Sequence, residues 1–183
     1  MKVLIDACVL YPTVMRQMVL GVAEAGAFTP LWSERIEEEW ARAARKIGPE
    51  GETIARGEIA ALSLRFPKAV VPVPQGAERR FWLPDPADIH VLAAAVGASA
   101  DAIMTLNARD FPRDVLAEEG LARVDPDTFL MGIWQAQPEL VAHVGQAVLA
   151  DARRLSGEEW EIRALLRKAR LPRLGKALAG RGA

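Results

Sequence analysis

Short apolar runs alternate along the chain with longer segments whose apolar residues recur at helical spacing. The first apolar run, residues 3–5, has the length of a buried strand and ends at Asp6. A helix is expected from Pro12 to about Ala25, where Gly26 supplies a stop. Strands alternating with helices predict an α/β fold around a parallel sheet, because parallel strands are joined by helical crossovers.

The segments that follow extend this pattern. Residues 28–32 are expected to be short and extended, and Ser33 is a suitable N-cap for an acidic helix over residues 34–46. A further helix is expected after Pro49. Residues 70–73 are rich in β-branched side chains but contain a proline, which predicts an edge strand or an extended connector rather than a central strand.

The segment "LPDPADIHVLAAA" carries two acids where a helix is expected to begin. Asp85 can cap the helix, the proline after it suits the first helical position, and Asp88 stands at the third. Capping explains only one of the two acids, so Asp85 is either a helix cap or a metal ligand or the partner of one. The helix is expected to end near Gly97, and residues 102–106, "AIMTL", are expected to form the next buried strand.

Three carboxylates are expected to meet at one edge of the sheet. Asp6 follows the first strand, Asp110 follows the 102–106 strand, and Asp88 lies on the helix that enters between them. In parallel sheets, ligands bind outside the carboxyl ends of the strands. Two carboxylates about 5 Å apart repel by roughly 3 kcal/mol at an effective dielectric constant near 20, so a shared site must take up a proton or a cation. Oxygen ligands favour Mg²⁺ or Mn²⁺, and there is no Cys or His cluster that would indicate zinc.

Composition limits the class of protein and its partners. A chain of 183 residues, 51% hydrophobic and 26% charged, excludes extensive disorder and indicates one compact body with additions. The net charge of −1 gives no overall basic field, so any nucleic-acid partner needs a local basic patch. The basic residues nearest in sequence to the predicted metal site are Arg109 and Arg113.

Cysteine usage and hydropathy bear on location. Cys8 is the single cysteine, so no internal disulfide can form. No signal-like segment opens the chain, and no apolar run has the length of a membrane span. We therefore expect a cytoplasmic protein without a membrane partner.

Four motifs in order resemble a PIN domain, and within that family they are similar to the VapC-like endoribonucleases of bacterial toxin–antitoxin systems. The motifs are "VLIDACVLYP", "SERIEEEW", "DPADIHVLAAA" and "TLNARDFP". The resemblance covers about residues 1–130 and implies a three-layer α/β/α sandwich with a central, mostly parallel sheet. Residues 131–183 are then expected to be a C-terminal helical extension packed on this domain.

The resemblance also implies a set of catalytic acids that binds one or two Mg²⁺ or Mn²⁺ ions and cleaves RNA. Carried over by position, Asp6 and Asp88 match two of these acids, and Glu39 best matches the helix glutamate. Its neighbours Glu37 and Glu38 leave the register of that match open.

The last of these acids falls within "NARDF". Many relatives carry aspartate where this chain has Asn107, so Asp110 would supply the charge. Asn107 would then be a neutral oxygen ligand or a substrate contact. Thr105 is expected either to position a water molecule or, as is more usual for a hydroxyl at a strand end, to bond the backbone.

The resemblance and the chemistry together predict a Mg²⁺- or Mn²⁺-dependent ribonuclease, with Asp6, Asp88 and Asp110 as metal ligands and Glu39 either orienting the attacking water or completing a second metal site. The resemblance implies the toxin of an antitoxin-controlled pair. Two alternatives stay open: a non-catalytic module that binds RNA or a partner protein, and a metal-dependent DNA nuclease or phosphatase that uses the same acids. The C-terminal helices can cover the core, form a homodimer or receive an antitoxin helix. The last ten residues, "LGKALAGRGA", are expected to be frayed.

Overall fold

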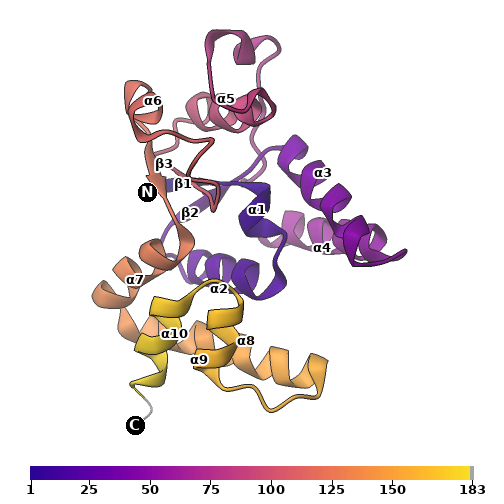
Figure 1. Ribbon diagram of the computed structural model, residues 1–183, viewed down its shortest axis with the longest axis vertical. Coiled ribbons are helices and arrows are strands. Elements are labelled where there is room, and N and C mark those ends of the chain that lie inside the picture. Colours follow the sequence, from indigo (N-terminus) through magenta and orange to yellow (C-terminus); the bar gives the residue numbers. More distant parts are fainter. Residues whose placement is uncertain (182–183) are drawn as a thin grey trace. The chain divides into compact units, whose positions relative to one another are not determined.

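The computed structural model describes residues 1–181 (Figure 1). By their contacts, the described residues group into two compact units. The first, here called the sheet unit, comprises residues 1–11 and 28–124. The second, here called the helical unit, comprises residues 12–27 together with the described residues from 125 onward. The domain boundary expected at residue 130 stays a prediction.

The strands of the sheet unit form, within the described chain, one four-stranded sheet in the order β2-β1-β3-β4 with every neighbouring pair parallel. Their bounds are β1 (Lys2–Ile5), β2 (Thr29–Leu31), β3 (Ala102–Met104) and β4 (Ala122–Val124). All of β3 and all but the first residue of β1 are buried, which explains why both read as unbroken apolar runs. The predicted α/β sandwich with a parallel central sheet is confirmed.

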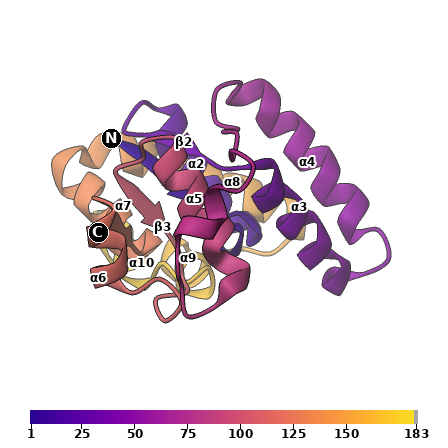
Figure 2. The same ribbon diagram turned by 90° about the horizontal axis from the view of Figure 1, so that it is seen from above.

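Helices flank this sheet. The α-helices of the sheet unit are α1 (Ala7–Leu10), α3 (Glu34–Ala43), α4 (Gly51–Arg65), α5 (Ile89–Gly97) and α6 (Arg113–Glu118). Three short 3₁₀ turns join them: η1 (Ala44–Ile47), η2 (Ala77–Arg80) and η3 (Pro86–Asp88). Helix α5 packs on β1 and β3, and α3 lies alongside α4 (Figure 2).

The sheet register brings the ends of β1 and β3 together. Ile5 is paired with Met104, and the backbone N–H of Asp6 donates to the carbonyl of Met104 at 3.0 Å. Asp6 and Thr105, the residues that follow these strands, therefore stand side by side at the carboxyl edge of the sheet. This edge is where the sequence predicts a ligand site.

Most of the predicted elements are present, with differences at short segments. Ser33 caps α3 by accepting from the N–H of Ile36 at 3.3 Å, as predicted. The predicted strand over residues 102–106 ends two residues early. Strand β4 and helix α1 were not predicted, because runs of three and four residues show too little periodicity.

The helical unit comprises α2 (Thr13–Glu24), α7 (Pro126–Ala136), α8 (Pro138–Ser156), α9 (Ile162–Lys168) and α10 (Pro172–Ala179). Helix α2 ends as predicted, with Gly26 in a left-handed conformation at φ +90°. Helix α2 packs closely on α8, since a Cβ at Gly21 would lie 2.7 Å from Cγ1 of Val144. Among residues 1–181 no helix is both long enough and apolar enough to cross a membrane.

The expectation of a frayed tail is wrong for most of its length, because α10 occupies Pro172–Ala179. Residues 182–183 of that tail lie outside the described residues. The buried carboxylate of Asp127 accepts from the backbone N–H groups of Arg173 at 2.9 Å and Leu174 at 3.0 Å. This distant aspartate satisfies donors in the first turn of α10, which explains why the helix forms there.

Replacing Asp127 with alanine is expected to lower the free energy of unfolding by about 2 kcal/mol, because two buried N–H groups lose their acceptor. Urea denaturation measures this change. The matched control is Asp151→Ala, which removes an exposed acid paired with Arg154 and should change stability by less than about 0.5 kcal/mol. Equal effects of the two substitutions would show that Asp127 does not hold α10.

Candidate metal centre

Asp85, Asp88 and Asp110 form a carboxylate cluster. One oxygen from each of the three side chains lies within 4.8 Å of the other two. Asp85 precedes η3, Asp88 ends η3 and caps α5, and Asp110 lies in the loop after β3. Asp85 is exposed, whereas Asp88 and Asp110 are half-buried.

Asp85 is a helix cap, and its role in metal binding stays a prediction. Its Oδ1 accepts from the backbone N–H of Ala87 at 2.9 Å, which is a helix-capping bond. The same carboxylate belongs to the cluster with Asp88 and Asp110. A carboxylate has about four lone-pair sites, so a capping bond leaves capacity for a cation.

Asn107 lies among these acids. Its side-chain amide donates to Oδ2 of Asp88 at 3.4 Å and, over a shorter distance, to Oδ2 of Asp110. Its backbone N–H donates to Oγ1 of Thr105 at 2.9 Å, so the hydroxyl is a backbone partner. The amide dipole offsets part of the repulsion between the two carboxylates, and the opposite amide orientation would present an oxygen ligand instead.

Asp6 lies deeper than the cluster, with only 6% of its surface exposed. Its Oδ2 accepts from the hydroxyl of Thr105 at 2.7 Å and from the thiol of Cys8 at 3.0 Å. The structure thus brings Asp88 and Asp110 together with Asp85 within 4.8 Å, and Asp6 acts on this cluster through its charge.

The burial and negative charge of this region change the pKa of Asp88. Burial, followed by the charges of Asp6, Asp85, Asp110 and Glu39, raises the pKa of Asp88 from 3.8 to about 6. The negative form of Asp88 is therefore disfavoured by its surroundings. A cation relieves the same repulsion that a proton relieves, and oxygen-only donors suit a hard divalent ion.

Two of the three neighbouring glutamates on α3 are engaged elsewhere. Glu37 accepts from the indole N–H of Trp32 at 2.8 Å. Glu38 accepts from Arg42 at 2.7 Å and pairs with Arg56 of α4 at 2.9 Å. The charges that raise the pKa of Asp88 include neither of these carboxylates.

Glu39 is the member of this run that bears on the cluster. Its charge contributes to the raised pKa of Asp88. Its Oε1 lies 2.8 Å from Nε2 of His90 and 3.6 Å from Nε of Arg35. The geometry therefore distinguishes Glu39, the best match by sequence, from the two neighbours that left the register open.

His90 is a site neighbour that the sequence did not reveal. Its side chain is 1% exposed, and its Nε2 lies 2.8 Å from Oε1 of Glu39, although neither ring nitrogen makes an aligned hydrogen bond to the described residues. The signal available in the sequence was a polar ring inside the apolar run of α5, which needs a partner when buried. That partner is on α3, about fifty positions away in the chain.

Replacing Glu39 with glutamine should lower the pKa of Asp88, because one of the charges that raises it is removed. NMR titration of the Asp88 carboxyl carbon measures this shift. Glu38→Gln is the matched control, since Glu38 faces Arg42 and Arg56 and should leave that pKa unchanged. Equal shifts in the two variants would mean that Glu39 does not face the cluster.

Other side chains near the cluster in sequence also have defined environments. Arg109 and Arg113 are exposed and have no carboxylate partner within the described part of the chain. Trp82, three residues before Asp85, is 66% exposed. Burial and the charge of Asp6 raise the pKa of Cys8 to about 12, which keeps the thiol protonated and unreactive.

Comparison with known proteins identifies one family. The family model described as "PIN domain" matches residues 2–109, more than half of the chain. The matched range contains Asp6, Glu39, Asp85 and Asp88 and ends one residue before Asp110. No curated protein and no solved structure matches the sequence.

Proposed function

This chain belongs to the PIN domain family, and from that premise we propose that it is an endoribonuclease that uses Mg²⁺ or Mn²⁺ to cleave RNA phosphodiester bonds. The observation that carries the proposal is the convergence of Asp85, Asp88 and Asp110 within 4.8 Å, in surroundings that raise the pKa of Asp88 to about 6. Such crowding destabilises the metal-free site and favours a divalent cation.

The residues present fit such a cation. Asp85, Asp88 and Asp110 would hold it directly, with Asp6 and the amide oxygen of Asn107 as further oxygen donors. When bound, the cation supplies positive charge that polarises the scissile phosphate and stabilises the developing negative charge.

The remaining roles belong to side chains of the chain itself. Glu39, held between His90 and Arg35, orients the attacking water by accepting its hydrogen bond. Thr105 holds the carboxylate of Asp6 through the 2.7 Å bond. The exposed guanidinium groups of Arg109 and Arg113 bind RNA phosphates.

For the biological role, we propose the toxin of an antitoxin-controlled pair of the VapBC type, acting in the cytoplasm. The four ordered motifs and the single cysteine support this role. Induced expression should arrest the growth of a bacterial host, and expression of Asp88→Asn at the same protein level should not. Arrest by both proteins would exclude a role that depends on cleavage.

Comparison of substrates tests the activity. The protein should cleave 5′-labelled RNA in Mg²⁺ or Mn²⁺, lose this cleavage in EDTA, and act on DNA of the same sequence and on p-nitrophenyl phosphate at least about 10²-fold more slowly. Preferred cleavage of DNA or of the small phosphoester would identify a DNA nuclease or a phosphatase. Binding of RNA with no cleavage of any substrate would identify a non-catalytic module.

A further inference from the structure

Positive charge is concentrated in the last two helices of the helical unit. Residues 162–181, which span α9 and α10, contain seven of the 23 basic residues and none of the 24 acidic residues. The preceding residues, 1–161, hold 16 basic against 24 acidic residues and carry a net charge of −8. The whole chain therefore has a nearly neutral net charge although it contains a strongly basic segment.

All seven of these basic side chains are exposed, and four have no partner among the described residues: Arg163, Arg167, Arg170 and Lys176. The other three are engaged. Lys168 lies over the ring of Trp160, Arg173 donates to Thr128, and Arg181 pairs with Glu139. Four exposed cations without counterions leave room for an external anion.

Structural roles account for only two of these four residues, since Lys176 lies in the last turn of α10, where the helix dipole favours a cation. The helix dipole favours a cation in the last turn of α9, which explains Arg167 but not Arg163 near the first turn. Arg170 has a φ of +61°, a conformation in which glycine is favoured, so the backbone gains nothing from arginine there.

The spacing of three arginines suits a chain of phosphates. Arg163 and Arg167 are four positions apart in α9, which places them on one side of that helix, and Arg170 follows two residues after its end. Along the helix the step from Arg163 to Arg167 corresponds to about 6 Å. A row of cations at such intervals is better neutralised by a linear polyanion than by a single small ion.

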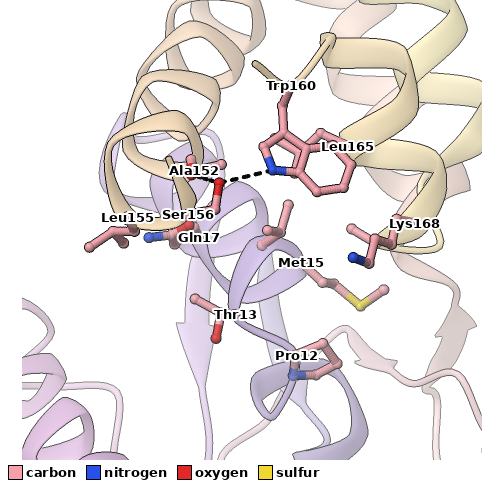
Figure 3. A pocket seen from close by; sticks show the side chains of 12 residues that line it. Pro12, Thr13, Met15, Gln17, Ala152, Leu155, Ser156, Trp160, Leu165 and Lys168 are labelled. Carbon is pink, nitrogen blue, oxygen red and sulfur yellow. Dashed lines mark hydrogen bonds between the residues drawn. The ribbon is translucent and has the colours of Figure 1, made fainter. Parts of the chain in front are cut away.

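A hollow in the same unit borders on α9. It has a volume of about 410 Å³ and mostly apolar walls that include Met15, Leu155, Trp160 and Leu165. Figure 3 shows Trp160 and Lys168 among the side chains that line it, with the indole N–H of Trp160 donating to Ser156 at 3.1 Å. The side of α9 that lines the hollow carries Leu165 and Lys168 and, at about 100° per residue, lies opposite Arg163 and Arg167. An aromatic ring beside a cation, here Trp160 beside Lys168, is a usual arrangement of a site for unstacked nucleic-acid bases.

We propose that the α9–α10 surface binds single-stranded RNA that curves around α9, with phosphates on Arg163, Arg167 and Arg170 and, on the other side of the helix, one unstacked base in the hollow beside Trp160 and Lys168. The choice of RNA as the polyanion rests on the proposed ribonuclease function. The surface itself lies in the helical unit and shares no residue with the carboxylate cluster of the sheet unit. It is a second site for RNA, distinct from the site of cleavage.

Fluorescence anisotropy with a labelled 20-nucleotide RNA in EDTA measures this binding without cleavage. The triple variant Arg163→Gln, Arg167→Gln, Arg170→Gln should bind roughly 10- to 100-fold more weakly at about 0.1 M salt, and the slope of log K against log salt should be shallower by about 2. The control triple variant Arg56→Gln, Arg65→Gln, Lys68→Gln removes the same charge from exposed residues of α4 and its end and should bind normally. Equal weakening in the two triple variants, or none in the first, would overturn the proposal.

Two further measurements distinguish a loss of RNA binding from unfolding of the protein and from binding to a different partner. Arg170→Gly should weaken RNA binding while keeping or raising the Tm, because glycine accommodates the positive φ. The wild type should bind single-stranded RNA more tightly than an RNA duplex of the same length, since only an unstacked base can enter the hollow. Equal affinity of the wild type for the duplex would contradict the proposal. So would a first triple variant that no longer binds anionic phospholipid vesicles but still binds RNA.

The two proposals can fail separately. If the wild-type protein binds RNA through this surface but cleaves nothing, the proposed ribonuclease function is contradicted and the proposed RNA-binding surface is supported. If the protein cleaves RNA and the first triple variant binds RNA with unchanged affinity, the proposed surface is contradicted and the proposed ribonuclease function is supported.

Discussion

Asp88→Asn is expected to reduce RNA cleavage on the order of 10³-fold while leaving the fold intact. Asp88 is a member of the carboxylate cluster, and the charges of Asp6, Asp85, Asp110 and Glu39 repel its negative form. Asparagine keeps the size of the side chain but removes the negative charge that a cation needs. Single-turnover cleavage of labelled RNA in saturating Mn²⁺ measures the loss.

The same substitution should raise stability when no divalent ion is present. The pKa of Asp88 is about 6 in the folded protein against 3.8 for the ordinary group, so the stability contributed by its protonated form is present below pH 4 and is lost as the pH rises through 6. At pH 8 in EDTA, Asp88→Asn should therefore be more stable than wild type by about 1 kcal/mol, a figure reduced for solvent screening of a half-buried group.

An exposed acid on α6 provides the control for both the cleavage measurement and the stability measurement. Asp114→Asn should retain full cleavage and unchanged stability in EDTA. An Asp88→Asn protein that cleaves RNA at the wild-type rate would exclude Asp88 from the reaction. A destabilised Asp88→Asn protein at pH 8 would show that repulsion does not dominate the metal-free site.

Mn²⁺ affinity is expected to depend steeply on pH. A cation competes with the proton on Asp88, whose pKa is raised to about 6 by burial and by four neighbouring carboxylates. The dissociation constant should be nearly constant above pH 7 and rise toward tenfold per pH unit below pH 6. Calorimetric titrations between pH 5 and pH 8 measure this dependence.

The Asp88→Asn protein is the control for the pH dependence as well. It should bind Mn²⁺ weakly at every pH, with a flatter profile, since the residue that competes for the proton is absent. Wild-type affinity that does not change between pH 5 and pH 8 would mean that Asp88 takes no part in binding.

Much of the sheet unit follows from local patterns in the sequence. Apolar runs of strand length, the Ser33 cap and the helix start after Asp85 are signals carried by a few adjacent residues, and each is present in the structure. The meeting of Asp88 with Asp110 could be anticipated because parallel strands end at one edge of the sheet.

What the sequence did not reveal depends on contacts between distant segments. The choice among Glu37, Glu38 and Glu39 depends on Trp32, Arg56 and His90, which no spacing rule connects. Asp127 and α10 are 46 positions apart, so the cap that orders the tail has no local signature. Asp85 has the sequence of a helix cap, and only the structure shows that its carboxylate also lies beside those of Asp88 and Asp110.

Titration of Mn²⁺ into metal-free protein at pH 8 tests the metal centre most directly. Wild-type protein should show saturable binding, and Asp110→Asn, which removes one carboxylate of the cluster, should weaken it at least about tenfold. Absence of saturable binding to the wild type, or the same isotherm for Asp110→Asn, would contradict a divalent cation at Asp85, Asp88 and Asp110.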